Sequence, residues 1–154
     1  MKRFYAVLIV FAVLMCLPIG AKAFVSNVSL SVGEGAIWTH GNAHRLPVSV
    51  ELIPSMSVLM ILKVDLGMYL TTEKPADFMV RPGIRVCTPF LYGRLAFPLK
   101  LTHGFDYGFL VGVGRDLVNL SIISLFIEVD TFFMHDTGFK AIPVEGRLGV
   151  SVGF

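Results

Sequence analysis

The chain has 154 residues, of which 55% are hydrophobic, and its 13 Lys and Arg nearly balance 11 Asp and Glu. Its mean hydropathy of +0.74 suits a membrane protein. Beyond residue 23, however, no stretch approaches the roughly 18 uncharged apolar residues of a spanning helix. The near-neutral charge excludes a basic surface for nucleic acid, and Cys87 is the single cysteine beyond residue 23, which excludes an internal disulfide.

The first 23 residues predict a cleaved secretory signal peptide. A basic start at residues 1–3 precedes an apolar run from Phe4 to Ile19, and Ala21-Lys22-Ala23 forms a small-x-small cleavage site. The apolar run is shorter than the roughly 20 residues that a membrane anchor needs. We therefore expect a single mature domain at residues 24–154.

The remaining chain divides into strand-like segments with a period of two. A hydrophobic secreted chain without spanning helices has one way to cross a membrane, a closed barrel, because every backbone hydrogen bond must be made internally. Eight segments of about the required length are present, and this is the smallest number usual for bacterial barrels. We expect strands near residues 25–33, 45–53, 56–70, 78–87, 91–101, 105–116, 121–134 and 143–154. The predicted fold is an all-β, closed, eight-stranded antiparallel up-and-down transmembrane β-barrel.

Each segment has an apolar stripe on one face and polar residues on the other. A soluble ligand-carrying barrel would turn the stripe inward, so the stripe alone does not decide the orientation. Glycines on the polar face favour an inward polar face, because an eight-stranded barrel is only just wide enough for its side chains. These glycines are Gly67, Gly83, Gly108, Gly112, Gly114, Gly149 and Gly153.

The charged residues of the polar faces predict an interior network of ion pairs. Buried charges are tolerated when they are paired, and antiparallel pairing brings Asp65 level with the segment from Arg81 to Arg85 and Lys100 opposite Asp106. Glu128 and Asp130 should likewise approach Arg147 and Glu145. We expect a closed polar core, with a gated ion path as the alternative. The predicted interior charges are Glu51, Lys63, Asp65, Arg81, Arg85, Arg94, Lys100, Asp106, Glu128, Asp130, Glu145 and Arg147.

The connections set the expected orientation. With both ends of the mature domain in the periplasm, the turns at 53–56, 87–90 and 115–120 are periplasmic, and the loops at 33–44, 71–77, 102–104 and 135–142 face outward. Aromatic residues near the two rims suit interfacial girdles. Those expected near the outer rim are Trp38, Tyr69, Phe78, Phe105 and Phe133, and those near the inner rim are Phe24, Phe90, Tyr92 and Phe154.

Side chains suited to catalysis or metal binding are sparse. All four histidines, His40, His44, His103 and His135, map to the outer loops, where together with Asp136 they have the ligand types of a metal site. Nothing in the sequence fixes their mutual distances, and no nucleophile, base and orienter set is present. We assign no catalytic residue, no metal and no cofactor.

The last strand carries the clearest resemblance to known proteins. Leu148, Val150, Val152 and Phe154 alternate with small or polar residues up to a final aromatic. Together with the signal peptide, the eight segments and the charged interior, this ending resembles small bacterial outer-membrane β-barrels of the OmpX type and the OmpA membrane domain. The resemblance implies that this strand is the signal read by the barrel-assembly machinery.

The resemblance also implies a cellular location and a range of functions. We expect a monomer in the bacterial outer membrane, with outer-membrane lipid and, during biogenesis, the barrel-assembly machinery as partners, and no nucleic acid. The preferred function is non-enzymatic, a structural or envelope-integrity role. The alternatives are a narrow channel for ions or small solutes and a barrel enzyme that modifies lipid A.

Overall fold

The computed structural model describes residues 25–39, 42–136 and 141–154, so the expected signal peptide at residues 1–23 lies outside the described residues. The described part forms ten strands that belong to one sheet. Their bounds are β1 Asn27–Thr39, β2 Asn42–Arg45, β3 Ser49–Leu59, β4 Leu62–Thr71, β5 Phe78–Cys87, β6 Tyr92–Ala96, β7 Leu99–Lys100, β8 Asp106–Leu120, β9 Ile123–Met134 and β10 Ile142–Gly153. Within these residues, no helix is long and apolar enough to cross a membrane.

The ten strands make an eight-stranded wall, because two wall strands are interrupted. β2 and β3 both pair with β1, and β6 and β7 both lie between β5 and β8. Pro47 lies in the first interruption and Pro98 in the second. Proline has no N–H to donate to a ladder, which explains why each wall strand is split at that point.

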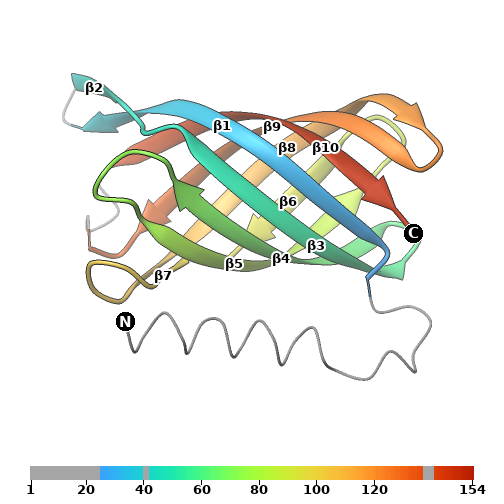
Figure 1. Cartoon of the computed structure of the whole chain (residues 1–154), viewed down its shortest axis with the longest axis horizontal. Coiled ribbons are helices and arrows are strands. Elements are labelled where there is room, and N and C mark those ends of the chain that lie inside the picture. The colour runs from blue at the N-terminus through green and yellow to red at the C-terminus, as the bar shows by residue number, and fades with distance from the viewer. Residues whose placement is uncertain (1–24, 40–41, 137–140) are drawn as a thin grey trace.

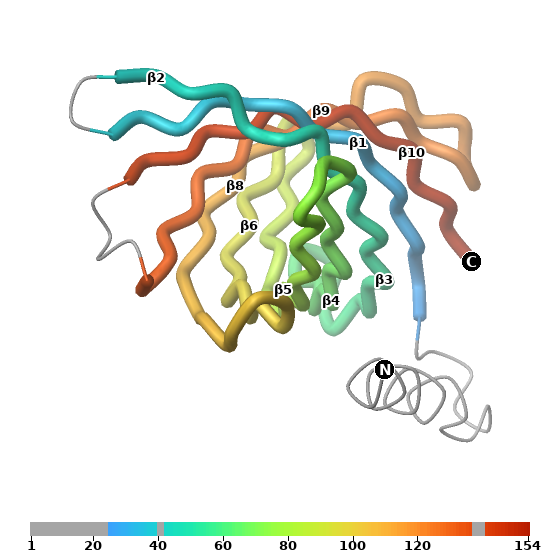
Figure 2. Tube along the Cα trace, turned by 60° about the vertical axis from the view of Figure 1, so that its left-hand side comes forward, coloured from blue at the N-terminus to red at the C-terminus, as the bar shows by residue number. Residues whose placement is uncertain are grey.

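The barrel closes where the first strand meets the last. Asn27 to Trp38 of β1 pair antiparallel with Gly153 to Ile142 of β10, and Figures 1 and 2 show these two strands side by side. All other neighbours are antiparallel as well. The predicted closed eight-stranded antiparallel barrel is confirmed.

Two predicted turns are wrong. The turn expected at 53–56 lies inside β3, where Pro54 pairs with Val28 of β1, and the chain turns at Met60 and Ile61 instead. Pro54 has no N–H to donate to the ladder, but flanking residues keep the ladder intact: the N–H of Ser26 donates to the carbonyl of Ser55. The turn expected at 115–120 is displaced in the same direction, because β8 continues to Leu120. The sheet therefore extends further at the end where β1 begins and β10 ends, and by the end that carries the termini we mean this end of the barrel.

The two faces of the wall differ as the alternation predicts. In β6, Tyr92, Arg94 and Ala96 are buried inside, while Leu95 between them is exposed on the outer surface. The same pattern runs through β8, β9 and β10. Large apolar side chains thus cover the outside, and the charges point to the barrel axis.

Candidate functional site

The interior of the barrel gathers most of the charged residues that the sequence placed there. Ten of the twelve are buried: Glu51, Asp65, Arg81, Arg85, Arg94, Asp106, Glu128, Asp130, Glu145 and Arg147. Lys63 and Lys100 are half-buried, because Lys63 lies near the end that carries the termini and Lys100 near the opposite loops. The site is therefore a compact network with a lysine towards each end.

Glu51 of β3 is the centre of this network. Its carboxylate lies 2.7 Å from Nη2 of Arg94, 3.3 Å from Nη1 of Arg81 and 3.4 Å from Nη2 of Arg147. These arginines come from β6, β5 and β10, so one carboxylate links four wall strands across the barrel. Ionic hydrogen bonds of this kind are stronger than neutral ones, and here all four side chains are out of contact with water.

A second set of contacts extends the network towards the end with the termini. Nη1 of Arg94 lies 3.2 Å from Glu128, and its Nε lies 3.7 Å from Asp65. Asp65 also contacts Nε of Arg85 at 3.0 Å. The hydroxyl of Tyr92 donates to Oε2 of Glu128 at 2.7 Å. This uncharged donor binds the carboxylate oxygen that Arg94 does not contact.

A third set surrounds Arg147 on β10. Its Nη1 lies 3.1 Å from Glu145, and its Nε lies 4.0 Å from Asp130. The same guanidinium donates to the hydroxyl of Ser31 at 2.9 and 3.1 Å. Ser49 donates to Glu145, so serines fill the gaps between charges.

Some contacts of the network follow strand register, and that of Lys100 does not. Asp65 contacts Arg85, and Arg147 lies near Asp130, as the register predicts. Glu145, two residues before Arg147 on β10, is close by as expected. Lys100 is opposite Asp106 in the ladder, yet its ammonium lies 3.2 Å from Asp77 in the preceding loop. The predicted position of Lys100 opposite Asp106 is confirmed, while its ammonium pairs with Asp77 because a long side chain can reach a partner outside its own ladder position.

Aromatic side chains border the network at both ends. Arg81 lies over the ring of Tyr69 at 3.6 Å, and Tyr69 meets Phe132 edge to face. Towards the termini, Tyr92 meets Phe126 in the same way. Tyr69 and Tyr92 were expected in the girdles on the outer surface, and both are buried inside.

Parity would have identified these two interior tyrosines. Tyr69 has the parity of Asp65 in its strand, and Tyr92 has that of Arg94. Their aromatic character alone suggested a rim position. Inside the barrel they supply a hydroxyl donor to Glu128 and a ring face to Arg81.

Glycines give the network its space. A Cβ atom on Gly67 would collide with Oε1 of Glu51, and one on Gly112 would collide with Oδ1 of Asp130. An eight-stranded barrel has little interior volume to spare. Gly67 and Gly112 therefore make room for carboxylates. A Cβ on Gly83, Gly108, Gly114 or Gly149 would instead collide with backbone or uncharged side-chain atoms, and one on Gly153, at the end of β10, meets nothing closer than 3.8 Å.

The buried charges do not balance. Six carboxylates face four guanidinium groups among the ten buried charges: Glu51, Asp65, Asp106, Glu128, Asp130 and Glu145 against Arg81, Arg85, Arg94 and Arg147. The buried centre is therefore acidic when every group is ionised, while the half-buried Lys63 and Lys100 towards the two ends bring the network as a whole into balance. A path through the buried centre would favour cations over anions.

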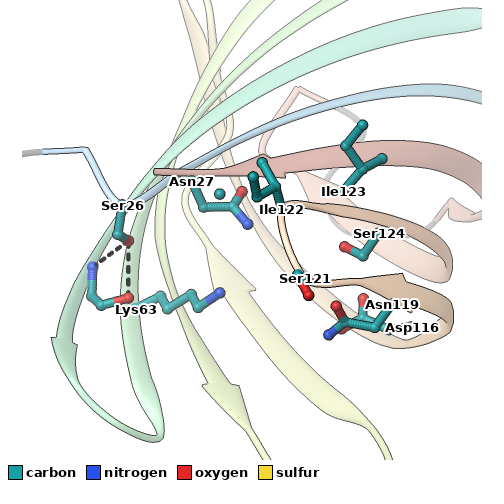
Figure 3. Close-up of a pocket in the computed structure, with 11 residues that line it drawn as sticks. Ser26, Asn27, Lys63, Asp116, Asn119, Ser121, Ile122, Ile123 and Ser124 are labelled. Carbon is teal, nitrogen blue, oxygen red and sulfur yellow. Dashed lines mark hydrogen bonds between the residues drawn. The ribbon is translucent and has the colours of Figure 1, made fainter.

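A polar pocket of about 220 Å³ opens at the end of the barrel that carries the termini. Figure 3 shows Lys63 on one side of it and Asp116, Asn119 and Ser121 on the other. The pocket also includes Ser26, Asn27, Ser57, Ile122, Ile123, Ser124 and Gly153. Its lining is thus mostly hydroxyl, amide and charged groups.

The loop histidines are dispersed at the opposite end. His103 lies 3.3 Å from Asp77, His135 stacks on Tyr107, and His44 is exposed on β2; His40 lies outside the described residues. Within the described ranges, no group of three or more His, Cys, Asp or Glu side chains is arranged to hold a metal ion.

Comparison with known proteins gives matches at the level of structure. No family model and no curated protein matches the sequence. The neisserial surface protein A, NspA, superposes with a TM-score of 0.51 at 13% identity over 83% of this chain and 96% of its own. Ail, the attachment invasion locus protein of Yersinia pestis, gives 0.54 at 12% identity over 85% and 100%. The fold is that of a small eight-stranded outer-membrane barrel.

Proposed function

We propose that this barrel spans the bacterial outer membrane and has a non-enzymatic, structural or envelope-integrity role. Its outer surface supports the membrane location. Many large apolar side chains there are at least 40% exposed, among them Leu30, Val32, Leu95, Val129 and Leu148. Soluble monomers seldom expose apolar patches beyond a few hundred Å². Lipid acyl chains are the natural partner of such a wall.

The observation that carries the structural role is the filled interior. Glu51 and the three arginines around it are fully buried and link strands on different sides of the barrel. Such a network closes the axis and stiffens the wall. A filled interior favours a structural role in the membrane over a role as a passage for ions or solutes.

Fractionation and gel mobility test the address and the closed barrel together. Expressed in a Gram-negative host, the protein should sediment with the outer membrane. Extracted in detergent, it should migrate differently before and after boiling, because a closed barrel keeps its shape in mild detergent. A soluble periplasmic protein with no boiling-dependent shift would contradict the proposal.

A narrow cation path is the second candidate, favoured by the acidic excess at the buried centre of the interior. Planar-bilayer recordings separate it from the closed barrel. We expect no steady conductance from the wild-type protein. Large, steady, cation-selective steps that disappear when Glu51 or Asp130 is replaced by the amide would establish the channel instead.

We also propose that the last strand is the assembly signal. Leu148 and Val150 are exposed on the outside of β10, and Phe154 is 84% exposed beyond its end, so these side chains are free to contact assembly machinery. Phe154→Ala removes few contacts from the folded barrel. It should therefore lower the amount assembled in cells while refolding in detergent stays unchanged; equal effects in both would contradict this role.

A further inference from the structure

The end of the barrel that carries the termini has a rim of exposed apolar side chains. We call this the terminal rim; its residues are Leu59, Met60 and Ile61 in the β3–β4 turn, Phe90 and Leu91 in the β5–β6 turn, Leu120 and Ile122 in the β8–β9 turn, and Phe154. Met60 is fully exposed, and Phe90 and Phe154 are more than 80% exposed. Turns in water are normally polar, so this rim calls for an apolar partner.

The opposite end has a different character. The β4–β5 loop exposes Thr72, Glu73 and Lys74, and the β7–β8 loop exposes His103, Gly104 and the single large apolar side chain Phe105. Apart from Phe105, these short loops are polar and suit water. The two ends therefore face different surroundings, and the terminal rim faces the less polar one.

The terminal rim is continuous with the outer wall. On β9 the exposed side chains of Val129, Ile127, Leu125 and Ile123 lead without a charged residue to the β8–β9 turn. On β8, Arg115 is the outward charge near this end, and its long stem allows the guanidinium to reach a headgroup layer while the methylenes stay in an apolar one.

The dimensions agree with immersion. From Tyr107 to Leu120, β8 covers about 33 Å along the membrane normal at ~3.3 Å per residue and a tilt near 40°. The apolar band of an outer-membrane barrel is about 25 Å tall. The outward positions of β8 are apolar over this length except for Arg115, so the wall brings the terminal rim at least to the boundary of the hydrocarbon layer.

The centre of the same end distinguishes lipid from a protein partner. Protein–protein interfaces have an apolar centre and a polar border. Here the order is reversed: the terminal rim at the turns is apolar, and the pocket between the strand ends is polar, with Lys63, Asp116 and Asn119 in its lining (Figure 3). A membrane surface fits this arrangement, because acyl chains can contact the apolar terminal rim while headgroups and water contact the polar pocket.

We propose that the terminal rim is set into the lipid leaflet, so that Met60, Leu120 and Phe154 contact phospholipid acyl chains while the central pocket faces the headgroup layer. The inference rests on the proposed membrane location and adds which end of the barrel the lipid covers. It gives the barrel one end that is submerged and one that stands in water.

Site-specific fluorescence tests the placement in the full chain. Trp38 is the sole tryptophan, so a Trp38→Phe background allows single tryptophans at Met60, Leu120, Lys74 and Leu95. Each variant is refolded into phosphatidylcholine vesicles and checked by gel mobility without boiling. Quenching is then measured with lipids brominated on their acyl chains and with aqueous acrylamide.

The expected result is that Met60→Trp and Leu120→Trp lose fluorescence with brominated lipid, as the wall variant Leu95→Trp does, whereas Lys74→Trp loses it with acrylamide. The inference is overturned if Met60→Trp and Leu120→Trp follow Lys74→Trp while Leu95→Trp is still quenched by lipid. If Leu95→Trp also escapes the brominated lipid, the membrane location itself is wrong, and the placement of the rim falls with it.

Discussion

Arg94 and Glu51 meet inside the barrel, with Nη2 of the arginine 2.7 Å from Oε1 of the carboxylate and both side chains fully buried. They come from β6 and β3, which are separated in the wall by β4 and β5. The pair therefore crosses the interior and ties two distant parts of the wall together. Its strength decides how firmly the barrel resists deformation.

Removal of the Glu51 carboxylate should lower the free energy of unfolding strongly. Glu51→Gln keeps the size of the side chain but leaves Arg81, Arg94 and Arg147 without their shared anion. Loss of one partner from a buried ion pair costs about 3–5 kcal/mol. Urea unfolding in lipid vesicles, followed by Trp38 fluorescence, measures the change. Glu34→Gln is the matched control, because Glu34 pairs with Arg45 on the exposed surface; similar losses for both variants would refute the central role.

The glycine at position 67 should resist enlargement. Gly67→Ala places a Cβ against Oε1 of Glu51 and 2.7 Å from Nη2 of Arg94, and such overpacking costs about 1–3 kcal/mol. Gly93→Ala provides the comparison on the outer face of β6, since a Cβ there meets nothing within 4 Å. The same unfolding assay should show a loss for the first and none for the second. A loss at Gly93 alone would reverse our assignment of the inner face.

The hydroxyl of Tyr92 should matter more than that of Tyr107. Tyr92→Phe leaves Glu128 without a donor that lies 2.7 Å away, and an unsatisfied buried polar group costs about 1–3 kcal/mol. Tyr107 is exposed and stacks on His135, so Tyr107→Phe should have little effect. Equal unfolding midpoints for the two variants would show that the Tyr92 hydrogen bond contributes nothing measurable.

A charge on the outer wall should destabilise the barrel according to depth. Leu148→Arg lies midway along β10 and Ile142→Arg at its beginning. A lipid-facing arginine costs about 2–4 kcal/mol at the midplane and about 0–1 kcal/mol near an interface. Unfolding in vesicles should therefore separate the two variants. The difference should vanish in detergent micelles, which adapt to the charge; an unchanged difference would point to packing rather than lipid.

The period-two pattern was sufficient to predict the strand count and which residues face inward, because a barrel wall separates two solvents. It did not locate the turns at Met60 and Ser121, since proline and polar residues within strands resemble turn signals. The ladder predicted the Asp65–Arg85 and Arg147–Asp130 contacts, in which partners lie on adjacent strands. The contacts of Glu51 with Arg94 and Arg81 depend on which side chains reach across the axis, and register between neighbours carries no information about that.

The β1–β10 seam also constrains when the chain can fold. Asn27 pairs with Gly153, so closure joins residues at opposite ends of the described chain, and contacts this distant in sequence are slow to form. No intermediate that lacks residues 142–153 can complete the ring. Until those residues are available, β1 keeps an unpaired edge that invites aggregation.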